Sequence, residues 1–185
     1  MLQDLSQYVL DISENSLKAG ASRVEIELCV DEQKDLVSLT VTDNGPGMDE
    51  ELLSMVVDPF CTTRRERKVG LGIPFLKQAA ETCEGFLRID SGKGEGTKVN
   101  VLLRKSHIDC PPMGDVASTV VALMVGWPDR SFVFRYAVDG KTLDLSTDQL
   151  LEILEDRNLL VLPEVAVWLR KYLSEQIEKL HMGRK

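Results

Sequence analysis

The sequence predicts an α+β fold, a two-layer sandwich in which a mixed sheet carries its helices on one face. Strand patterns occur in pairs joined by short polar or glycine-rich turns, and helical patterns lie between the pairs rather than between single strands. Paired strands indicate hairpins, which argues against a doubly wound parallel sheet. The chain of 185 residues is long enough for one domain with a substantial extension.

The first hundred residues alternate helices with hairpins. Leu2, Leu5, Val9 and Ile12 recur at helical spacing, and Gly20 ends this first predicted helix. Apolar and charged residues then alternate, which predicts a hairpin. The elements expected after the first helix are strands at 24–30 and 37–41, helices at 49–57 and 71–83 with Gly85 as the stop, and strands at 86–90 and 98–104.

A proline-containing segment at 105–115 is the predicted boundary between two parts. We expect a domain at 1–105 and a C-terminal α/β extension of unknown role at 115–185. The extension is predicted to hold an apolar segment at 117–125, strands at 131–137 and 141–145, a helix capped by Thr147 and a last helix from Pro163. The apolar stripe of the last helix fits packing on its own domain or a seam between two copies equally.

Composition excludes several classes of function. The net charge of −8 disfavours nucleic acid as a partner. The four cysteines form no CxxC pair, so free thiols are expected rather than a metal centre. The start of the chain lacks a signal-peptide pattern, and the longest apolar stretch, 120–127, is too short to span a bilayer. We therefore expect a cytoplasmic protein without a membrane partner.

Three polar residues of the first helix share one face. Asp11, Asn15 and Lys18 lie at positions i, i+4 and i+7. A carboxylate, an amide and an ammonium group in this order can activate a nucleophile, ligate a metal and hold a phosphate. Mg²⁺ prefers oxygen ligands and keeps several waters, so one amide oxygen and phosphate oxygens suffice. The alternative is a solvated helix face with an incidental ion pair.

Glycines accompany the other candidate residues. Asp43 ends a strand and precedes Gly45 and Gly47, so its carboxylate can accept a hydrogen bond from an exocyclic amine while the backbone passes close to a base. The alternative is a plain turn. The second glycine pair lies in the sequence Gly70-Leu71-Gly72, directly after a cationic stretch that contains Thr63. These glycines begin a predicted helix, and the N-terminus of a helix can bind an anion.

The last glycine cluster, GEGT at 94–97, is a hairpin turn that brings Thr97 to the same region; taken alone, it fits a flexible turn. Two common phosphate-binding motifs are absent from the sequence, since nothing matches GxxxxGK[ST] or a GxGxxG between a strand and a helix. His107 and His181 have no partner arrangement that suggests catalysis.

Taken together, these segments resemble the GHKL superfamily, the Bergerat fold of histidine kinases, gyrase B subunits, mismatch-repair ATPases and serine-type anti-sigma kinases. The resemblance extends over about residues 2–104. DISENSLKAGA resembles the N box, DNGPG the G1 box, DPFCTTR the F box, VGLGI the G2 box and GEGT the last glycine box. The segment at 63–70 is short for the lid of this family.

The resemblance implies a role for each matching residue. Asn15 would ligate Mg²⁺, Asp43 would bind the adenine amine with Gly47 and Thr97 nearby, and Gly70, Leu71 and Gly72 would contact the phosphates. Asp11 falls where ATP-hydrolysing and serine-kinase relatives carry a glutamate base, although aspartate is shorter. Lys18, Gly45 and Thr63 complete the expected ATP site.

We therefore expect a histidine-kinase-like module that binds Mg-ATP and acts on the γ-phosphate, as a protein kinase or an ATPase, with a separate protein partner. No phosphoacceptor helix precedes residue 2, so the phosphoacceptor or output is expected in another chain. The alternative is a non-catalytic ATP sensor that changes how the C-terminal part docks on a partner or on a second copy.

Overall fold

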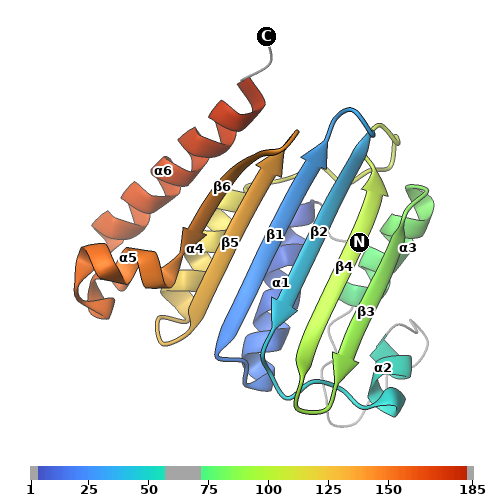
Figure 1. Cartoon of the computed structure of the whole chain (residues 1–185), viewed down its shortest axis with the longest axis horizontal. Helices are drawn as coiled ribbons and strands as arrows, with labels where there is room; N and C mark the ends of the chain where they lie inside the picture. Colours follow the sequence, from blue (N-terminus) through green and yellow to red (C-terminus); the bar gives the residue numbers. More distant parts are fainter. Residues whose placement is uncertain (1–3, 57–71, 183–185) are drawn as a thin grey trace.

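The computed structural model describes residues 4–56 and 72–182. In this part of the chain, six strands form one mixed sheet in the order β3-β4-β2-β1-β5-β6 (Figure 1). β1 and β5 run parallel, and all other neighbours are antiparallel, which confirms the predicted mixed sheet. The strands are β1 (Arg23–Asp31), β2 (Leu36–Asp43), β3 (Phe86–Gly92), β4 (Gly96–Arg104), β5 (Ser131–Val138) and β6 (Lys141–Ser146).

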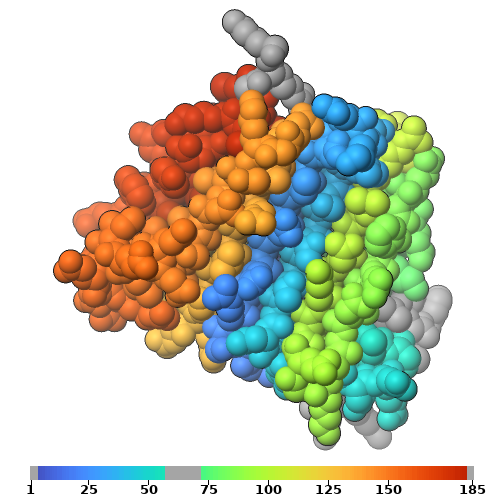
Figure 2. Space-filling model, viewed as in Figure 1, coloured from blue at the N-terminus to red at the C-terminus, as the bar shows by residue number. Residues whose placement is uncertain are grey.

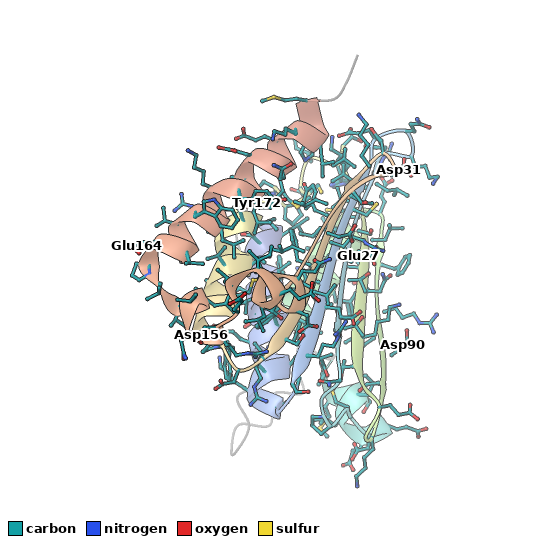
Figure 3. The ribbon with its side chains drawn as sticks, turned by 60° about the vertical axis from the view of Figure 1, so that its left-hand side comes forward. Glu27, Asp31, Asp90, Asp156, Glu164 and Tyr172 are labelled. Atoms are coloured by element: carbon teal, nitrogen blue, oxygen red, sulfur yellow. The ribbon has the colours of Figure 1, made fainter. Side chains whose placement is uncertain are left out.

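The helices cover one face of this sheet. Figure 1 looks onto the other face, with α1 and α4 behind the strands, and the turned view of Figure 3 shows the helical layer beside the sheet. The helical elements are α1 (Leu5–Ala19), α2 (Glu50–Val56), α3 (Gly72–Thr82), α4 (Val116–Gly126), α5 (Thr147–Leu154), the 3-10 helix η1 (Arg157–Val161) and α6 (Pro163–Met182).

The sheet is buried on its helical face and solvated on the other. Along β1, Val24, Ile26 and Leu28 are fully buried, whereas Glu25 and Glu27 between them are exposed. This is the alternation expected for a sheet with one face packed on a core. The solvated face is polar, and the space-filling view in Figure 2 looks onto it.

The C-terminal part completes the same sheet and the same core. β5 pairs with β1 in the middle of the sheet, and α4 packs between α1 and α6. Leu5 donates its N–H to Pro112 O at 2.9 Å, which ties the start of α1 to the connection before α4. The division into two domains at residues 1–105 and 115–185 stays a prediction. In the structure, both ranges contribute strands to one sheet and side chains to one core.

The structure adds detail at one predicted helix end and corrects another. α3 ends at Thr82, before Gly85; the left-handed residue is Glu84, with φ 56°, and the N–H of Gly85 bonds to Ala80 O at 2.8 Å. Gly85 also permits close packing, since a Cβ there would lie 1.8 Å from Leu102 O. The cap of α5 is Ser146, which accepts from Gln149 N at 3.1 Å, and Thr147 is the first helical residue.

None of the helices within residues 4–56 and 72–182 combines the length and the apolar character needed to cross a membrane.

Candidate functional site

The polar face of α1 carries the predicted acid–amide pair. Asp11 Oδ2 accepts a hydrogen bond of 3.3 Å from Asn15 Nδ2, one helical turn further on. Within the described residues, nothing donates to Asn15 Oδ1, so this oxygen remains available to a ligand. Lys18 forms an ion pair with Glu14 on the exposed side of the helix.

α3 begins directly against Asp11. Gly72 is the first residue of α3, and a Cβ at this position would lie 1.9 Å from Asp11 Oδ2. A side chain at this position would displace the carboxylate, so glycine lets the start of α3 lie directly against it. Burial raises the pKa of Asp11, with a further increase from the neighbouring charge of Glu14, while the hydrogen bond from Asn15 and the charge of Lys18 oppose the shift.

A second carboxylate lies at the end of β2, across from the same helix. Asp43 Oδ2 accepts a hydrogen bond of 2.6 Å from Ser16 Oγ, and its Oδ1 accepts one of 2.8 Å from Gly45 N. Ser16 directly follows Asn15, so the two candidate carboxylates, Asp11 and Asp43, are both tied to neighbouring positions of α1. The hydroxyl and the amide fix the rotamer of Asp43 and leave further acceptor positions on its oxygens.

The two glycine segments after β2 and β3 touch each other. A Cβ on Gly47, which has φ 65°, would lie 1.9 Å from Gly92 O, and one on Gly96 would lie 2.0 Å from Asp43 O. Gly94 N donates to Pro46 O at 2.7 Å. The turn after Asp43 therefore packs on the β3–β4 hairpin through backbone atoms, a contact that any Cβ would prevent.

An open pocket of about 440 Å³ lies where these segments meet. Its volume falls within the range of small-molecule sites. Asp43 and Thr97 are register partners on β2 and β4, and Thr97 Oγ1 lies 2.9 Å from Ser91 Oγ. The pocket is lined by Thr42, Asp43, Leu53, Ile89, Asp90, Ser91, Gly92, Glu95, Gly96, Thr97 and Lys98.

A family model agrees with this geometry. Residues 2–107 match the model described as histidine kinase-, DNA gyrase B- and HSP90-like ATPase. The chain belongs to this ATPase family. The predicted resemblance to the GHKL superfamily is confirmed, and the matched range ends just after β4.

Individual relatives are matched over only a small part of their own length. Sporulation kinase A of Bacillus subtilis is 27% identical over 101 residues, which is 55% of this chain and 16% of the kinase. The chain thus spans about a sixth of this relative. The N-terminal domain of a DNA repair protein superposes with a TM-score of 0.56 at 17% identity, over 79% of this chain and 53% of that one.

The fold is also that of the Aquifex aeolicus MutL ATPase domain complexed with ADP. The TM-score is 0.50 at 18% identity, and the match covers 84% of this chain and 70% of that chain. Two strands, three α-helices and the 3-10 helix η1 follow residue 107, outside the range that the family model matches.

The sequence-predicted site residues fall into three groups. Asp11, Asn15 and Gly72 lie together beside the middle of α1, and Lys18 pairs with Glu14 on the exposed side of the helix. Asp43, Gly45, Gly47 and Thr97 gather around the pocket. Thr63, Gly70 and Leu71 lie outside the described residues.

Sequence reasoning missed two hydroxyls. Ser16 holds Asp43, and Ser91 accepts a 2.9 Å hydrogen bond from Met48 N beside Thr97. The strand register could have revealed Ser91, because the hairpin pairs it with Thr97. Nothing in the sequence pattern pointed to Ser16, whose contact with Asp43 depends on how α1 lies on the sheet.

The donor set at Asn15 suits magnesium. The GHKL resemblance implies Mg²⁺ with ATP, and Asn15 Oδ1 is a hard oxygen donor beside the carboxylate of Asp11. Within the described residues, no group of three or more acidic, histidine or cysteine side chains forms a separate metal cage. A site of this type takes its remaining ligands from phosphate and water.

Proposed function

We propose that this GHKL ATPase domain binds Mg-ATP and hydrolyses or transfers the γ-phosphate together with a separate protein partner. The observation that carries the proposal is the pairing of two carboxylates with neighbouring positions of α1. Asp11 bonds to Asn15, and Asp43 bonds to Ser16. Asn15 and Ser16, two successive residues of α1, thus connect the part of the site proposed to bind the base with the part proposed to bind the phosphates.

Asp43 and its pocket suit the adenine base. An exocyclic amine donates, and the Asp43 carboxylate accepts, whereas a carbonyl at the same place on the ring would meet a second acceptor. Leu53 and Ile89 supply apolar surface in the same pocket, and Thr97 supplies a hydroxyl. The MutL ATPase domain, which shares this fold, is complexed with ADP, and this supports an adenine nucleotide as the ligand here.

The other end of the site suits the phosphates. Asn15 Oδ1 would hold Mg²⁺, which would neutralise phosphate charge when bound. The N-terminus of α3 begins at Gly72 beside Asp11, and a helix N-terminus favours an anion. Gly70, Leu71 and Thr63 complete this end in our proposal through their match to the family boxes.

Asp11 is the proposed base. Its raised pKa makes the carboxylate a better proton acceptor near neutral pH than an exposed aspartate. Asn15 Nδ2 holds Oδ2, and within the described residues no donor engages Oδ1. Oδ1 would therefore accept the proton of a water or of a partner's hydroxyl or imidazole as that group attacks the γ-phosphorus, the bond to the β–γ bridging oxygen breaks and ADP leaves.

Titration calorimetry and a phosphate assay test this proposal. ATP with Mg²⁺ should bind to the wild type, and Asp11→Asn should keep binding but lose turnover measured with γ-labelled ATP in the presence of candidate partners. Full turnover by Asp11→Asn would remove its role as a base. Absence of ATP binding to the wild type would overturn the proposed function as a whole.

A non-catalytic ATP sensor is the second candidate. Its support is the hydrogen bond between Asn15 and Asp11, since the amide proposed to hold the metal already contacts the proposed base. A ligand that binds the Asn15 amide would weaken its hydrogen bond to Asp11, and would thereby alter the contact between Asp11 and the start of α3. The sensor predicts Mg-ATP binding without phosphate release or transfer under any partner condition.

A further inference from the structure

α6 presents apolar side chains on two sides of the helix. Its buried residues, Leu169 and Leu173, face the body of the protein, where α6 packs on α4, β5 and β6. Other large apolar residues of α6 point to solvent, with Val167 69% and Trp168 57% exposed. Figure 1 shows α6 at the outer margin of the fold, with no described element beyond it.

The exposed aromatic residues are ordered against each other. The rings of Trp168 and Tyr172 stack with their centroids 5.5 Å apart and an interplanar angle of 11°. Tyr172 is 36% exposed, and Val165, half-buried, lies one turn before Trp168. Spacings of three and four residues align these side chains, which we call the aromatic stripe (Val165, Trp168 and Tyr172).

The stripe is unusual for a surface with no partner. Aromatic residues are enriched at protein interfaces, and a stacked pair presents a large rigid surface at a low entropic cost. In contrast, Ile108 is 93% exposed on the connection after β4 as a single residue, which needs no explanation.

Charge favours a second copy of this chain as the occupant. The whole chain carries −8, but α6 is neutral, since its acidic residues Glu164, Glu175 and Glu178 are balanced by Arg170, Lys171 and Lys179. Two copies can therefore approach through α6 with less repulsion than through an average part of the surface.

The charge order also selects a direction. Glu164 and Lys171 are seven residues apart, so they lie along the same edge of the aromatic stripe. Two parallel copies would place this edge of one helix and the same edge of the other on opposite sides of the seam, so Glu164 and Lys171 would not meet. Two antiparallel copies related by a two-fold axis near Trp168 would set each Glu164 beside Lys171 of the second copy. Lys171 is exposed, and its contact with Glu175 is long, at 3.9 Å, so its ammonium group can turn to a new partner.

We propose that two copies of this chain associate through α6, antiparallel about a two-fold axis beside Trp168. In this arrangement Trp168 faces Trp168 of the second copy, and Val165 faces Tyr172 of the second copy on both sides. The contact is isologous, so it closes as a dimer and does not propagate. Three side chains from each copy make a small interface, of the class that buries about 1,200 Å² or less in transient complexes. Association should therefore depend on protein concentration.

Sedimentation velocity of the full chain without nucleotide, from about 10 to about 500 μM, tests the proposal over the range expected for a weak interface. A monomer–dimer shift is expected for the wild type. Trp168→Glu should give a monomer throughout, and the control Ile108→Glu should match the wild type. Circular dichroism of both variants verifies folding, which exposed positions should preserve.

A charge exchange tests the direction. Glu164→Lys and Lys171→Glu should each weaken the dimer, and the double variant should recover most of the wild-type association. A monomer at every concentration, or a dimer that Trp168→Glu leaves intact, would overturn the interface. A double variant weaker than both single variants would overturn the antiparallel arrangement. Because no nucleotide is added, the result is separate from the outcome of the ATP-binding tests.

Discussion

Replacing Gly47 by alanine should destabilise the protein more than the same change at Gly94. Both residues adopt left-handed backbone conformations, with φ 65° at Gly47 and φ 83° at Gly94. This conformation costs about 1–2 kcal/mol for an alanine. Only Gly47 has a steric term in addition, because its Cβ would lie 1.9 Å from Gly92 O, whereas nothing lies within 4 Å of a Cβ on Gly94.

The steric term can be estimated from the overlap. A carbon–oxygen contact is normally about 3.3 Å or longer, so the β3–β4 turn or the Gly47 segment must move by about 1.4 Å. Such displacement in packed structure typically costs about 1–3 kcal/mol. The total for Gly47→Ala is therefore about 2–5 kcal/mol, against about 1–2 kcal/mol for Gly94→Ala.

Thermal unfolding followed by circular dichroism measures this difference. A chain of this size loses about 2–4 °C in Tm per kcal/mol, so Gly47→Ala should melt roughly 2–12 °C below Gly94→Ala. Equal Tm values for the two variants would mean that the turn after Asp43 does not pack on the hairpin, and the described meeting of the two glycine segments would be wrong.

Three further substitutions address single contacts of the site. Ser16→Ala removes the 2.6 Å bond to Asp43, and ATP affinity measured by calorimetry should fall several-fold, since Asp43 loses one of the two donors that hold its rotamer; unchanged affinity would exclude a positioning role. Asn15→Ala should abolish the Mg²⁺ dependence of ATP binding in the same assay, and an unaltered response to Mg²⁺ would refute the metal role. Asp11→Asn should stabilise the protein at neutral pH. The raised pKa means that the folded state holds the Asp11 proton more tightly than the unfolded state, so stability from this group is greatest at low pH and falls as pH rises from about 3.8 through the folded pKa. Urea unfolding at several pH values should therefore show a gain from Asp11→Asn that grows with pH across this window and then levels off; a gain that shrinks with pH would contradict the raised pKa.

The sequence predicted the local elements well because each has a local cause. Alternating apolar residues define β1, and the turn at Asp139 and Gly140, both with positive φ, joins β5 to β6 as expected. The mixed sheet followed from the pairing of strands into hairpins. The exact cap of α5 was harder to predict, since Ser146 and Thr147 are both suitable capping residues and the structure uses Ser146.

The sequence alone did not predict how the elements are arranged relative to one another. β5 lies parallel to β1, a pairing between strands about a hundred residues apart that no local pattern encodes. For the same reason the sequence separated the C-terminal residues from the sheet that they complete. In the candidate site, the family boxes predicted roles for Asp43 and Gly47, but the contacts from Ser16 to Asp43 and from Gly72 to Asp11 depend on how α1 and α3 pack.

The central claim is that one site along α1 binds an adenine nucleotide with magnesium, with Asp43 binding the base and Asn15 binding the metal. Isothermal titration calorimetry of the wild type and of Asp43→Asn with ATP and with GTP, each in the presence of Mg²⁺, tests it most directly. We expect the wild type to bind ATP in preference to GTP, and Asp43→Asn to lose at least about tenfold in ATP affinity, which corresponds to about 1.4 kcal/mol. Absence of heat with ATP in the wild type, or equal ATP affinity in Asp43→Asn, would contradict the account.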